Sequence, residues 1–357
     1  MVNPSEFVEL VSGRRGGVGA GLARAGLRLA ETPYSLVAQA RNLAFDRGWK
    51  PTLHVPAPVV SVGNITTGGT GKTPMVAWIA RWFRERDVRV AIVSRGYGAA
   101  RGERGDEALE LEDRLPDVPG VQNPDRVAAA ELAIHEFESQ LILLDDAFQH
   151  RRIARDLDVV MLDAMRPFGF DHVFPRGMLR EPLSGLSRAD AVILSRADGV
   201  PPDERARIRR TVARYAPRAA WVEVSHRPAC LLSADGAREP LAALTRKRVA
   251  AFCGIGNPSG FRHTLANLGC DLVDFRALPD HHAYRREDVT ELSSWAARSG
   301  AELVLCTHKD LVKVGLERLG DKRLLAVVIG IEFLAGREAL EELLARVHER
   351  IAPSDDD

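Results

Sequence analysis

The chain has 357 residues, of which 45% are hydrophobic and 27% are charged, and its formal net charge is zero. This composition is ordinary for a soluble globular protein of two domains or one large α/β unit, and the neutral balance gives no general attraction to nucleic acid. The four cysteines are scattered without a CxxC pair, which argues against a zinc site and a disulfide framework. No run of about 18 apolar residues occurs, so the sequence predicts no membrane-spanning helix.

The first 50 residues are basic and amphipathic. An apolar arc runs through residues 18–30, and Arg24 and Arg28 lie one turn apart on the other side. A segment of this kind can lie in a membrane interface with its arginines on anionic lipid, or it can be a helix that simply packs on the domain. We expect residues 1–50 to form a separate segment that faces the membrane.

A glycine-rich loop follows a short β-branched run. Residues 59–62 are predicted to form a strand, the loop after it ends in Gly71-Lys72-Thr73, and an amphipathic helix follows with Pro74 in its first turn. Strand, glycine loop, Lys-Thr and helix together are the context of a phosphate-binding P-loop. Its backbone N–H groups and the helix N-terminus bind phosphate oxygens. Lys72 is expected to reach the β- and γ-phosphates, and the Thr73 hydroxyl to ligate Mg²⁺.

The loop departs from the strict P-loop pattern at one position. Thr66 stands where a glycine is usual, and Gly68 and Gly69 supply the flexibility instead. A Gly-rich turn that happens to contain a lysine is the less favoured interpretation. The nucleotide-binding residues are therefore predicted to be Thr66, Thr67, Gly68, Gly69, Thr70, Gly71, Lys72 and Thr73.

Further predicted strands end in polar residues. The strand over 88–94 is followed by Arg95, and an apolar strand over 141–144 is followed by Asp145 and Asp146. In an open α/β sheet the loops at the carboxyl ends of the strands face the ligand, so Arg95 is placed for a phosphate or a sugar. The acid pair is a Walker-B-like arrangement that directs carboxylate oxygens to Mg²⁺, and a buried carboxylate needs such a cation or hydrogen-bond donors.

Two more strands are predicted over residues 158–163 and 191–195. Between them lies a loop without helix or strand periodicity, whose Arg180 is a candidate phosphate ligand. The second strand ends in Ser195-Arg196-Ala197-Asp198, which resembles the base-reading loop of P-loop GTPases. This pattern supports an alternative function, a regulatory GTPase or metallochaperone-type NTPase, although the sequence lacks a CxxC or His-rich metal motif.

The chain changes character after about residue 201. A charged helical stretch and a strand over 219–224 lead into a linker-like region, and a second series of strands and helices begins near residue 249. The expected fold is α/β: a P-loop NTPase-type, mostly parallel sheet with helices on both faces, plus a smaller C-terminal α/β domain. The predicted domains are 51–225 and 226–357.

Taken together, the motifs resemble the tetraacyldisaccharide 4′-kinase family of lipid A biosynthesis, from about residue 34 to about residue 347. The resemblance rests on residues 63–64, 69–74, 94–98, 105–107, 145–152, 179–182, 280–281 and 307–310. It implies ATP- and Mg²⁺-dependent phosphorylation of the 4′-hydroxyl of a tetraacylated, 1-phosphorylated glucosamine disaccharide. It also implies a peripheral, monotopic enzyme on the anionic cytoplasmic face of the inner membrane, and no obligate protein partner is inferred.

The resemblance also assigns roles to residues. Asp106 is expected to be the base that acts on the sugar hydroxyl, with His281 as its dyad partner and Lys72 as the third catalytic group. Metal ligands are expected among Thr73, Glu107, Asp145 and Asp146. Substrate-binding residues are expected to be Asn64, Arg95, Tyr97, Arg126, Gln149 and Arg180. Because Asp106 and His281 lie in different halves of the chain, they are expected to meet only when the two halves face each other across a cleft.

Overall fold

The computed structural model describes residues 4–96, 106–280 and 282–351, and the side chains of residues 4, 5, 106 and 107 are not described. The chain divides into two compact units. The larger contains residues 1–95, 118–225 and 332–357, and the smaller contains residues 96–117 and 226–331. This division differs from the predicted ranges, because residues 96–117 group with the smaller unit and the C-terminal helix groups with the larger.

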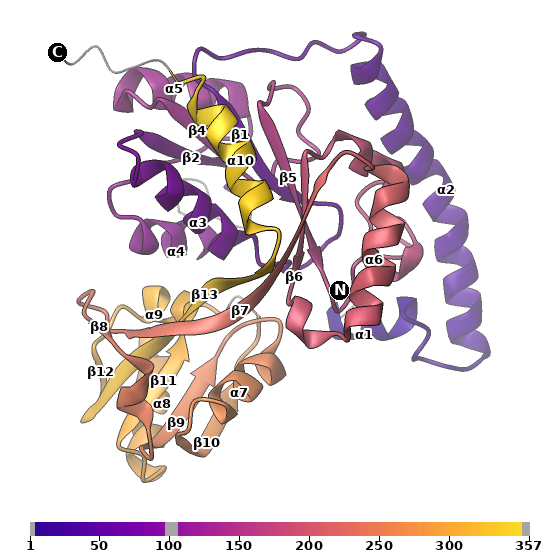
Figure 1. The fold of residues 1–357 in the computed structure, drawn as a ribbon. Coiled ribbons are helices and arrows are strands. Elements are labelled where there is room, and N and C mark those ends of the chain that lie inside the picture. Colours follow the sequence, from indigo (N-terminus) through magenta and orange to yellow (C-terminus); the bar gives the residue numbers. More distant parts are fainter. Residues whose placement is uncertain (1–3, 97–105, 281, 352–357) are drawn as a thin grey trace, which may run out of the picture. The chain divides into compact units, whose positions relative to one another are not determined.

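The larger unit is built on parallel strands in the order β3-β2-β4-β1-β5-β6-β7, of which all but β3 are labelled in Figure 1. The strands are β1 (Val59–Asn64), β2 (Val90–Ser94), β3 (Gly120–Gln122), β4 (Leu141–Asp145), β5 (Leu157–Asp163), β6 (Ala191–Ser195) and β7 (Ala220–Leu232). Strands β1, β4, β5 and β6 are buried at every residue. A parallel strand covered on both faces needs a continuous apolar run rather than an alternation of apolar and polar residues. The sequence could therefore predict these strands.

Helices and short 3-10 turns complete the larger unit. They are α1 (Pro4–Val11), α2 (Val18–Asp46), α3 (Lys72–Arg84), α5 (Arg126–Phe137), α6 (Pro202–Tyr215), α10 (Arg337–His348), η1 (Gly169–Asp171), η2 (Leu183–Arg188) and η3 (Ala197–Gly199). Val127 and Ala130 of α5 pack in one apolar cluster with β1, β2 and β4. Ile208 and Val212 of α6 pack in another with β5 and β6. The sheet edge that carries the motifs is therefore rigidly supported.

The smaller unit has its own parallel strands in the order β10-β9-β11-β13. Its elements are α4 (Asp106–Arg114), β8 (Arg238–Glu239), η4 (Leu241–Leu244), β9 (Arg248–Cys253), α7 (Pro258–Ala266), β10 (Asp271–Ala277), α8 (Arg286–Arg298), β11 (Leu303–Thr307), α9 (His308–Val314), β12 (Arg318–Leu319) and β13 (Lys322–Ala335). The short strand β12 pairs antiparallel with β13, and β8 pairs antiparallel with β7.

Two long strands run from one unit into the other. Strand β7 continues to Leu232, although the sequence predicted a strand that ends at 224 and a linker after it. Residues 226–230 alternate between partly buried and exposed positions before Leu231 and Leu232 are buried again. The continuous run of buried apolar residues therefore ends before the strand does. Strand β13 likewise extends beyond its predicted span of 324–331.

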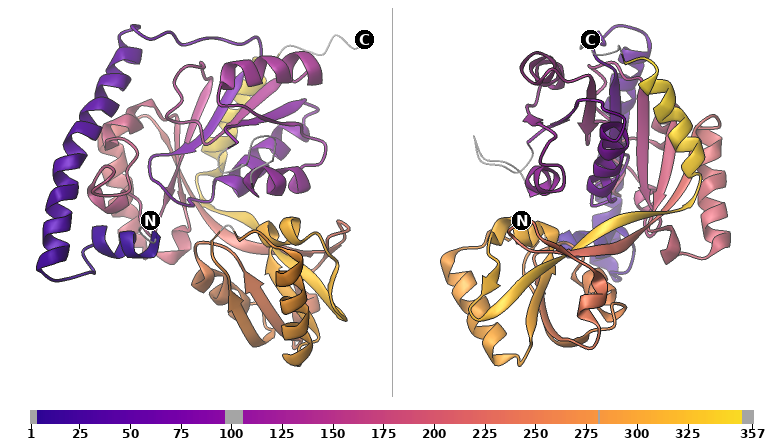
Figure 2. Two further views of the ribbon diagram at one scale, coloured as in Figure 1. Left: turned by 180° about the vertical axis from the view of Figure 1, so that it is seen from behind. Right: turned by 60° about the vertical axis from the view of Figure 1, so that its left-hand side comes forward.

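Helix α2 is a single helix of 29 residues despite Pro33 in its interior, and Figure 2 shows it as one long ribbon. Its partly buried positions recur every three or four residues, at Arg24, Leu27, Glu31, Ser35 and Ala38. This spacing is that of one helical face, so the remaining face is left exposed.

Candidate active site

The glycine-rich loop is shaped for an anion. Gly68 and Gly71 have φ angles of 109° and 79°, in the left-handed region that favours glycine. Gly71 precedes α3, and no side chain caps the first N–H groups of that helix. Uncapped N–H groups and the helix dipole bind phosphate. Lys72 and Thr73 are the first residues of the helix and are buried.

Neighbouring segments brace the loop on both sides. The Asn64 amide donates to the Thr70 hydroxyl over 3.2 Å. Thr67 N donates to the Met178 carbonyl over 2.7 Å, and Arg180 N donates to the Ile65 carbonyl over 2.7 Å. Backbone hydrogen bonds thus join residues 178–180 to the glycine-rich loop. These bonds fix the position of the Arg180 backbone beside the loop.

Asp146 lies between two cations. Its Oδ1 is 3.5 Å from Lys72 Nζ and accepts a hydrogen bond of 2.8 Å from the Arg180 guanidinium. Burial alone would raise the pKa of Asp146, but Lys72 and Arg180 outweigh burial and hold the pKa below its usual value. The carboxylate is therefore ionised at neutral pH. Asp145, buried at the end of β4, is in register with Val62 of β1, next to the loop.

Gly63 lets the loop after β4 approach β1. A Cβ at this position would lie 2.6 Å from Phe148 Cβ and 2.7 Å from Phe148 N. Any larger residue would push the loop away from the strand. The glycine thereby places the segment after Asp146 against the P-loop strand.

Gln149 and Glu181 join three parts of the larger unit. Gln149 Nε2 donates to the Asn64 carbonyl over 2.9 Å and to Glu181 over 3.0 Å. Glu181, only 2% exposed, also accepts from Asn42 of α2 over 2.7 Å and pairs with Arg188 at 2.9 Å. The P-loop strand, the Arg180 segment and α2 are therefore held in one polar network.

Arg126, the first residue of α5, is another buried cation at this edge. It donates to the Pro124 carbonyl over 3.1 Å. Burial lowers the pKa of Arg126, the charge of Arg95 lowers it further, and Asp146 and Asp145 oppose both effects. The predicted residues Arg95 and Arg126 thus share one electrostatic environment with the acid pair.

The donors at this edge suit Mg²⁺. Thr73, Asp145 and Asp146 offer hard oxygen ligands beside a phosphate loop, and Mg²⁺ usually takes one or two carboxylates, waters and substrate phosphates. Among the described residues, no three His, Cys, Asp or Glu side chains gather as a protein-only metal cage. A metal bound partly through phosphate does not require one.

Comparisons with known proteins agree with this geometry. The family model described as tetraacyldisaccharide-1-P 4′-kinase matches residues 23–349. This chain belongs to the tetraacyldisaccharide 4′-kinase family. A relative from Anaeromyxobacter dehalogenans (strain 2CP-C), named tetraacyldisaccharide 4′-kinase, is 44% identical, and the match covers 93% of this chain and 92% of the relative. One from Desulfatibacillum aliphaticivorans is 38% identical, with 88% and 90% covered.

A solved structure supports the same membership. LpxK from Aquifex aeolicus in complex with ATP is 29% identical, covers 91% of this chain and 99% of its own, and superposes with a TM-score of 0.76. The predicted family and α/β fold class are confirmed, and the chain is a kinase rather than the alternative regulatory GTPase or metallochaperone. In the described part of the chain, no helix is long and apolar enough to span a membrane.

The remaining residues predicted to act in the kinase reaction either begin α4 in the smaller unit or lie outside the described residues. Asp106 and Glu107 begin α4, with undescribed side chains, and Tyr97 and His281 lie outside the described residues. Helix α4 belongs to the smaller unit, because Asp113 bonds His308 of α9 over 2.6 Å and Arg114 donates to the Ile329 carbonyl over 3.0 Å. His281 lies outside the described residues, so the expected meeting of Asp106 and His281 stays a prediction.

The turn over residues 307–310, at the end of β11, holds its neighbours through Asp310. Asp310, fully buried, accepts from Gly254 N over 3.0 Å and from the Tyr284 hydroxyl over 2.8 Å. Tyr284 is two residues beyond His282 in the sequence, and Gly254 is close in space, because a Cβ on Gly254 would lie 3.1 Å from His282 Cβ. Asp310 therefore fixes the two segments that hold Gly254 and Tyr284.

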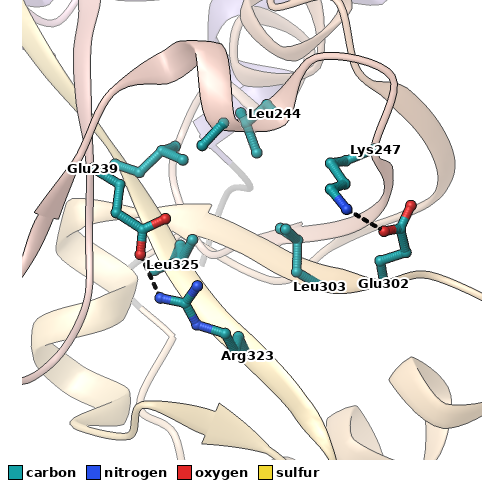
Figure 3. A pocket seen from close by; sticks show the side chains of 9 residues that line it. Glu239, Leu244, Lys247, Glu302, Leu303, Arg323 and Leu325 are labelled. Atoms are coloured by element: carbon teal, nitrogen blue, oxygen red, sulfur yellow. Dashed lines mark hydrogen bonds and ion pairs between the residues drawn. The ribbon is translucent and has the colours of Figure 1, made fainter.

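One pocket of the smaller unit lies apart from these residues. It has a volume of about 230 Å³, a floor that includes Leu244, Leu303 and Leu325, and two ion pairs at its sides (Figure 3). The pairs are Lys247 with Glu302 and Arg323 with Glu239. None of the predicted site residues lines it, so it is not the kinase site.

Sequence reasoning missed three contributors, Glu181, Asn42 and Arg196. Glu181 stands in the recognised Arg180-Glu181-Pro182 motif, which was the available signal. Asn42 gave none, because its role depends on a partner 139 positions away. Arg196 donates to the Gly69 carbonyl over 3.1 Å, and its signal was the pattern at the end of β6.

Proposed function

We propose that this chain transfers the γ-phosphate of ATP to the 4′-hydroxyl of a tetraacylated, 1-phosphorylated glucosamine disaccharide, a precursor of lipid A. The convergence of Lys72 and Arg180 on Asp146 beside the phosphate loop carries the proposal. The names of the relatives, and ATP in the Aquifex aeolicus LpxK structure, support it. Incubating the protein with ATP, Mg²⁺ and the disaccharide should give one phosphorylated product, and a phosphate at any position other than 4′ would contradict the proposal.

Phosphoryl transfer needs positioning and charge neutralisation more than covalent chemistry. The N–H groups at the start of α3 and the Lys72 ammonium would bind the terminal phosphates. Arg180, oriented by Asp146 and by its backbone bond to Ile65, would bind an anionic oxygen of the nucleotide or the lipid substrate. Mg²⁺ held by Thr73, Asp145 and Asp146, with Glu107 as a further predicted ligand, would neutralise phosphate charge when bound.

The proton of the sugar hydroxyl needs an acceptor. We assign it to Asp106, the first residue of α4, with His281 as the partner that orients it, following the family resemblance. Helix α4 belongs to the smaller unit. The anchoring of α4 through His308 and Ile329 supports this role, because a general base must be held in position.

Substitution tests the dyad. Asp106→Ala should lower kcat by about 10²–10⁴-fold while ATP binding survives, because a base is needed for chemistry and not for holding phosphates. His281→Ala should cause a similar or smaller loss, and the double variant should lose less than the product of the two. Fully multiplicative losses would show that the two residues act separately.

The exposed face of α2 supports a peripheral position on the cytoplasmic face of the inner membrane. Leu22, Leu29, Leu36 and Leu43 recur every seven residues and are exposed, with Leu29 78% accessible. Residues seven apart lie on one side of a helix. The polar residues Glu31 and Asn42 instead bond to the body of the larger unit. An apolar stripe flanked by arginines suits an anionic lipid surface.

Vesicle binding tests this surface. Co-sedimentation with anionic vesicles should weaken with salt and should fall strongly in the double variant Leu22→Glu/Leu29→Glu. Leu132→Glu is the matched control, because Leu132 is an exposed leucine on α5, and α5 lies away from α2 (Figures 1 and 2). Equal binding by the double variant and the control would place the membrane contact elsewhere.

A further inference from the structure

A cluster of buried polar side chains holds α4 against α9. Glu110, Arg114 and His308 are each no more than 6% exposed. His308 Nε2 lies 2.6 Å from Asp113 Oδ2, and His308 Nδ1 lies 3.9 Å from Glu110 Oε1. Arg114 pairs with Glu110 at 2.8 Å and donates to the Ile329 carbonyl over 3.0 Å. Buried polar groups are costly unless they are paired, so these contacts fix the orientation of α4 on its neighbours.

The His308 ring is a hydrogen-bond donor to Asp113. Burial lowers the pKa of His308, Glu110 and Asp113 raise it, Arg114 lowers it, and the net direction is down. The ring is therefore neutral at neutral pH and carries one N–H. We assign this N–H to Nε2, because an ionised carboxylate can only accept. Among the described residues, Nδ1 has no hydrogen-bond partner, which agrees with this tautomer.

Helix α9 is itself fixed, so it can serve as a support for α4. The helix follows β11 directly. Its buried Asp310 accepts from Gly254 N and from the Tyr284 hydroxyl. Further along the helix, Lys313 donates to the His282 carbonyl over 3.3 Å. Helix α9 is thus bonded to two other segments of the smaller unit as well as to α4, and it gives α4 a rigid partner.

Position 106, which holds the proposed base, is at the other end of α4 from the bond to His308. Positions 106, 110 and 113 of this helix are separated by four and three residues, so they share one side of it. Seven positions separate 106 from 113, which is about 10 Å along the helix axis. Over that length a tilt of about 6° moves position 106 by about 1 Å. A misplacement of about 1 Å can cost about 10²-fold in rate.

We propose that His308 is a positioning residue of the phosphotransfer reaction, which holds α4 through Asp113, beside the buried pair of Glu110 and Arg114, and so keeps Asp106 in place. The inference rests on the proposed function and on Asp106 as its base. His308 exchanges no proton with the substrate and acts only through Asp106. Its loss should therefore appear in kcat and not in the binding of ATP, because the phosphate loop belongs to the larger unit.

Steady-state kinetics of single variants of the full chain test the positioning role. His308→Leu removes the donor and should lower kcat by about 10²-fold with an unchanged KM for ATP. His308→Gln should retain most of the wild-type kcat, because a glutamine amide can donate to Asp113 in place of Nε2–H. Asp113→Ala removes the acceptor at a side chain that is 39% exposed, and it should reproduce the loss even if His308→Leu does not fold. His263→Leu, at an exposed position of α7, is the matched control and should keep the wild-type kcat.

A double variant distinguishes positioning of the base from general structural support. Asp106→Ala combined with His308→Leu should be no slower than Asp106→Ala alone, because His308 acts only through Asp106. Multiplicative losses, or a His308→Gln enzyme as slow as His308→Leu, would overturn the positioning role and leave the kinase proposal standing. Wild-type kcat in Asp113→Ala would do the same. A wild type that phosphorylates no lipid would instead overturn the proposed function, and this inference with it.

Discussion

Replacing Glu181 with alanine should destabilise the larger unit strongly. The Glu181 side chain is 3% exposed and faces Arg188, whose own side chain is 15% exposed, with both carboxylate oxygens 2.9 Å from the same guanidinium nitrogen. Removing one partner of a buried ion pair leaves the other charge without compensation, which costs about 3–5 kcal/mol. The hydrogen bonds from Asn42 and Gln149 are lost as well. We therefore expect Glu181→Ala to lower the free energy of unfolding by about 3–5 kcal/mol.

Urea denaturation of matched variants measures the effect. Glu181→Ala and Arg188→Ala should each lower the unfolding midpoint, and the double variant should cost less than the sum by about 0.5–3 kcal/mol, because the two residues form one interaction. Glu204→Ala is the control: its partner Arg207 is exposed, and an exposed pair contributes about 0–1 kcal/mol. Equal losses in Glu181→Ala and Glu204→Ala would refute the buried network.

Three further outcomes follow from individual residues. Lys72→Ala should lower kcat by about 10²–10³-fold or more with an unchanged circular dichroism spectrum, and normal turnover would remove Lys72 from the phosphate site. Gly63→Ala should cost about 1–3 kcal/mol through the clash with Phe148, and wild-type stability would contradict that contact. Burial and nearby arginines lower the pKa of His150 to about 4 from 6.5. The unfolded chain therefore binds the proton first, so stability should fall as pH drops from 6.5 toward 4, and His150→Gln should flatten that slope if this residue is its source.

The strands nearest the phosphate loop could be predicted because their chemistry is local. Strands β1, β4, β5 and β6 are buried on both faces, so each reads as an uninterrupted apolar run with polar residues at its end. Residues 226–230 of β7 are partly buried or exposed, and only the last two residues of the strand are buried again, so this half of the strand gives no such run. The length of β7 depends on its pairing with strands of the smaller unit, and that pairing cannot be predicted from the local sequence.

The parts of the site that depend on contacts between distant residues could not be predicted from the sequence. The assignment of α4 to the smaller unit depends on the bond between Asp113 and His308, which are 195 residues apart. The role of Glu181 depends on Asn42, Gln149 and Arg188 together. The phosphate loop, by contrast, is a single segment. Its glycines, Lys72 and Thr73 lie within a few positions of one another, and this pattern predicts phosphate binding. The local motifs were therefore sufficient to predict the reaction. The positions of these motifs relative to one another depend on tertiary contacts.

The dependence of ATP turnover on the lipid acceptor tests the central claim most directly. Purified protein with ATP and Mg²⁺ should release ADP only when the tetraacylated disaccharide 1-phosphate is added, and each ADP should be matched by one 4′-phosphorylated lipid. Lys72→Ala should lower both signals together, by the same factor as its kcat. ADP release at the same rate without the lipid, or without a phosphorylated lipid product, would contradict the assignment of this chain as a lipid 4′-kinase.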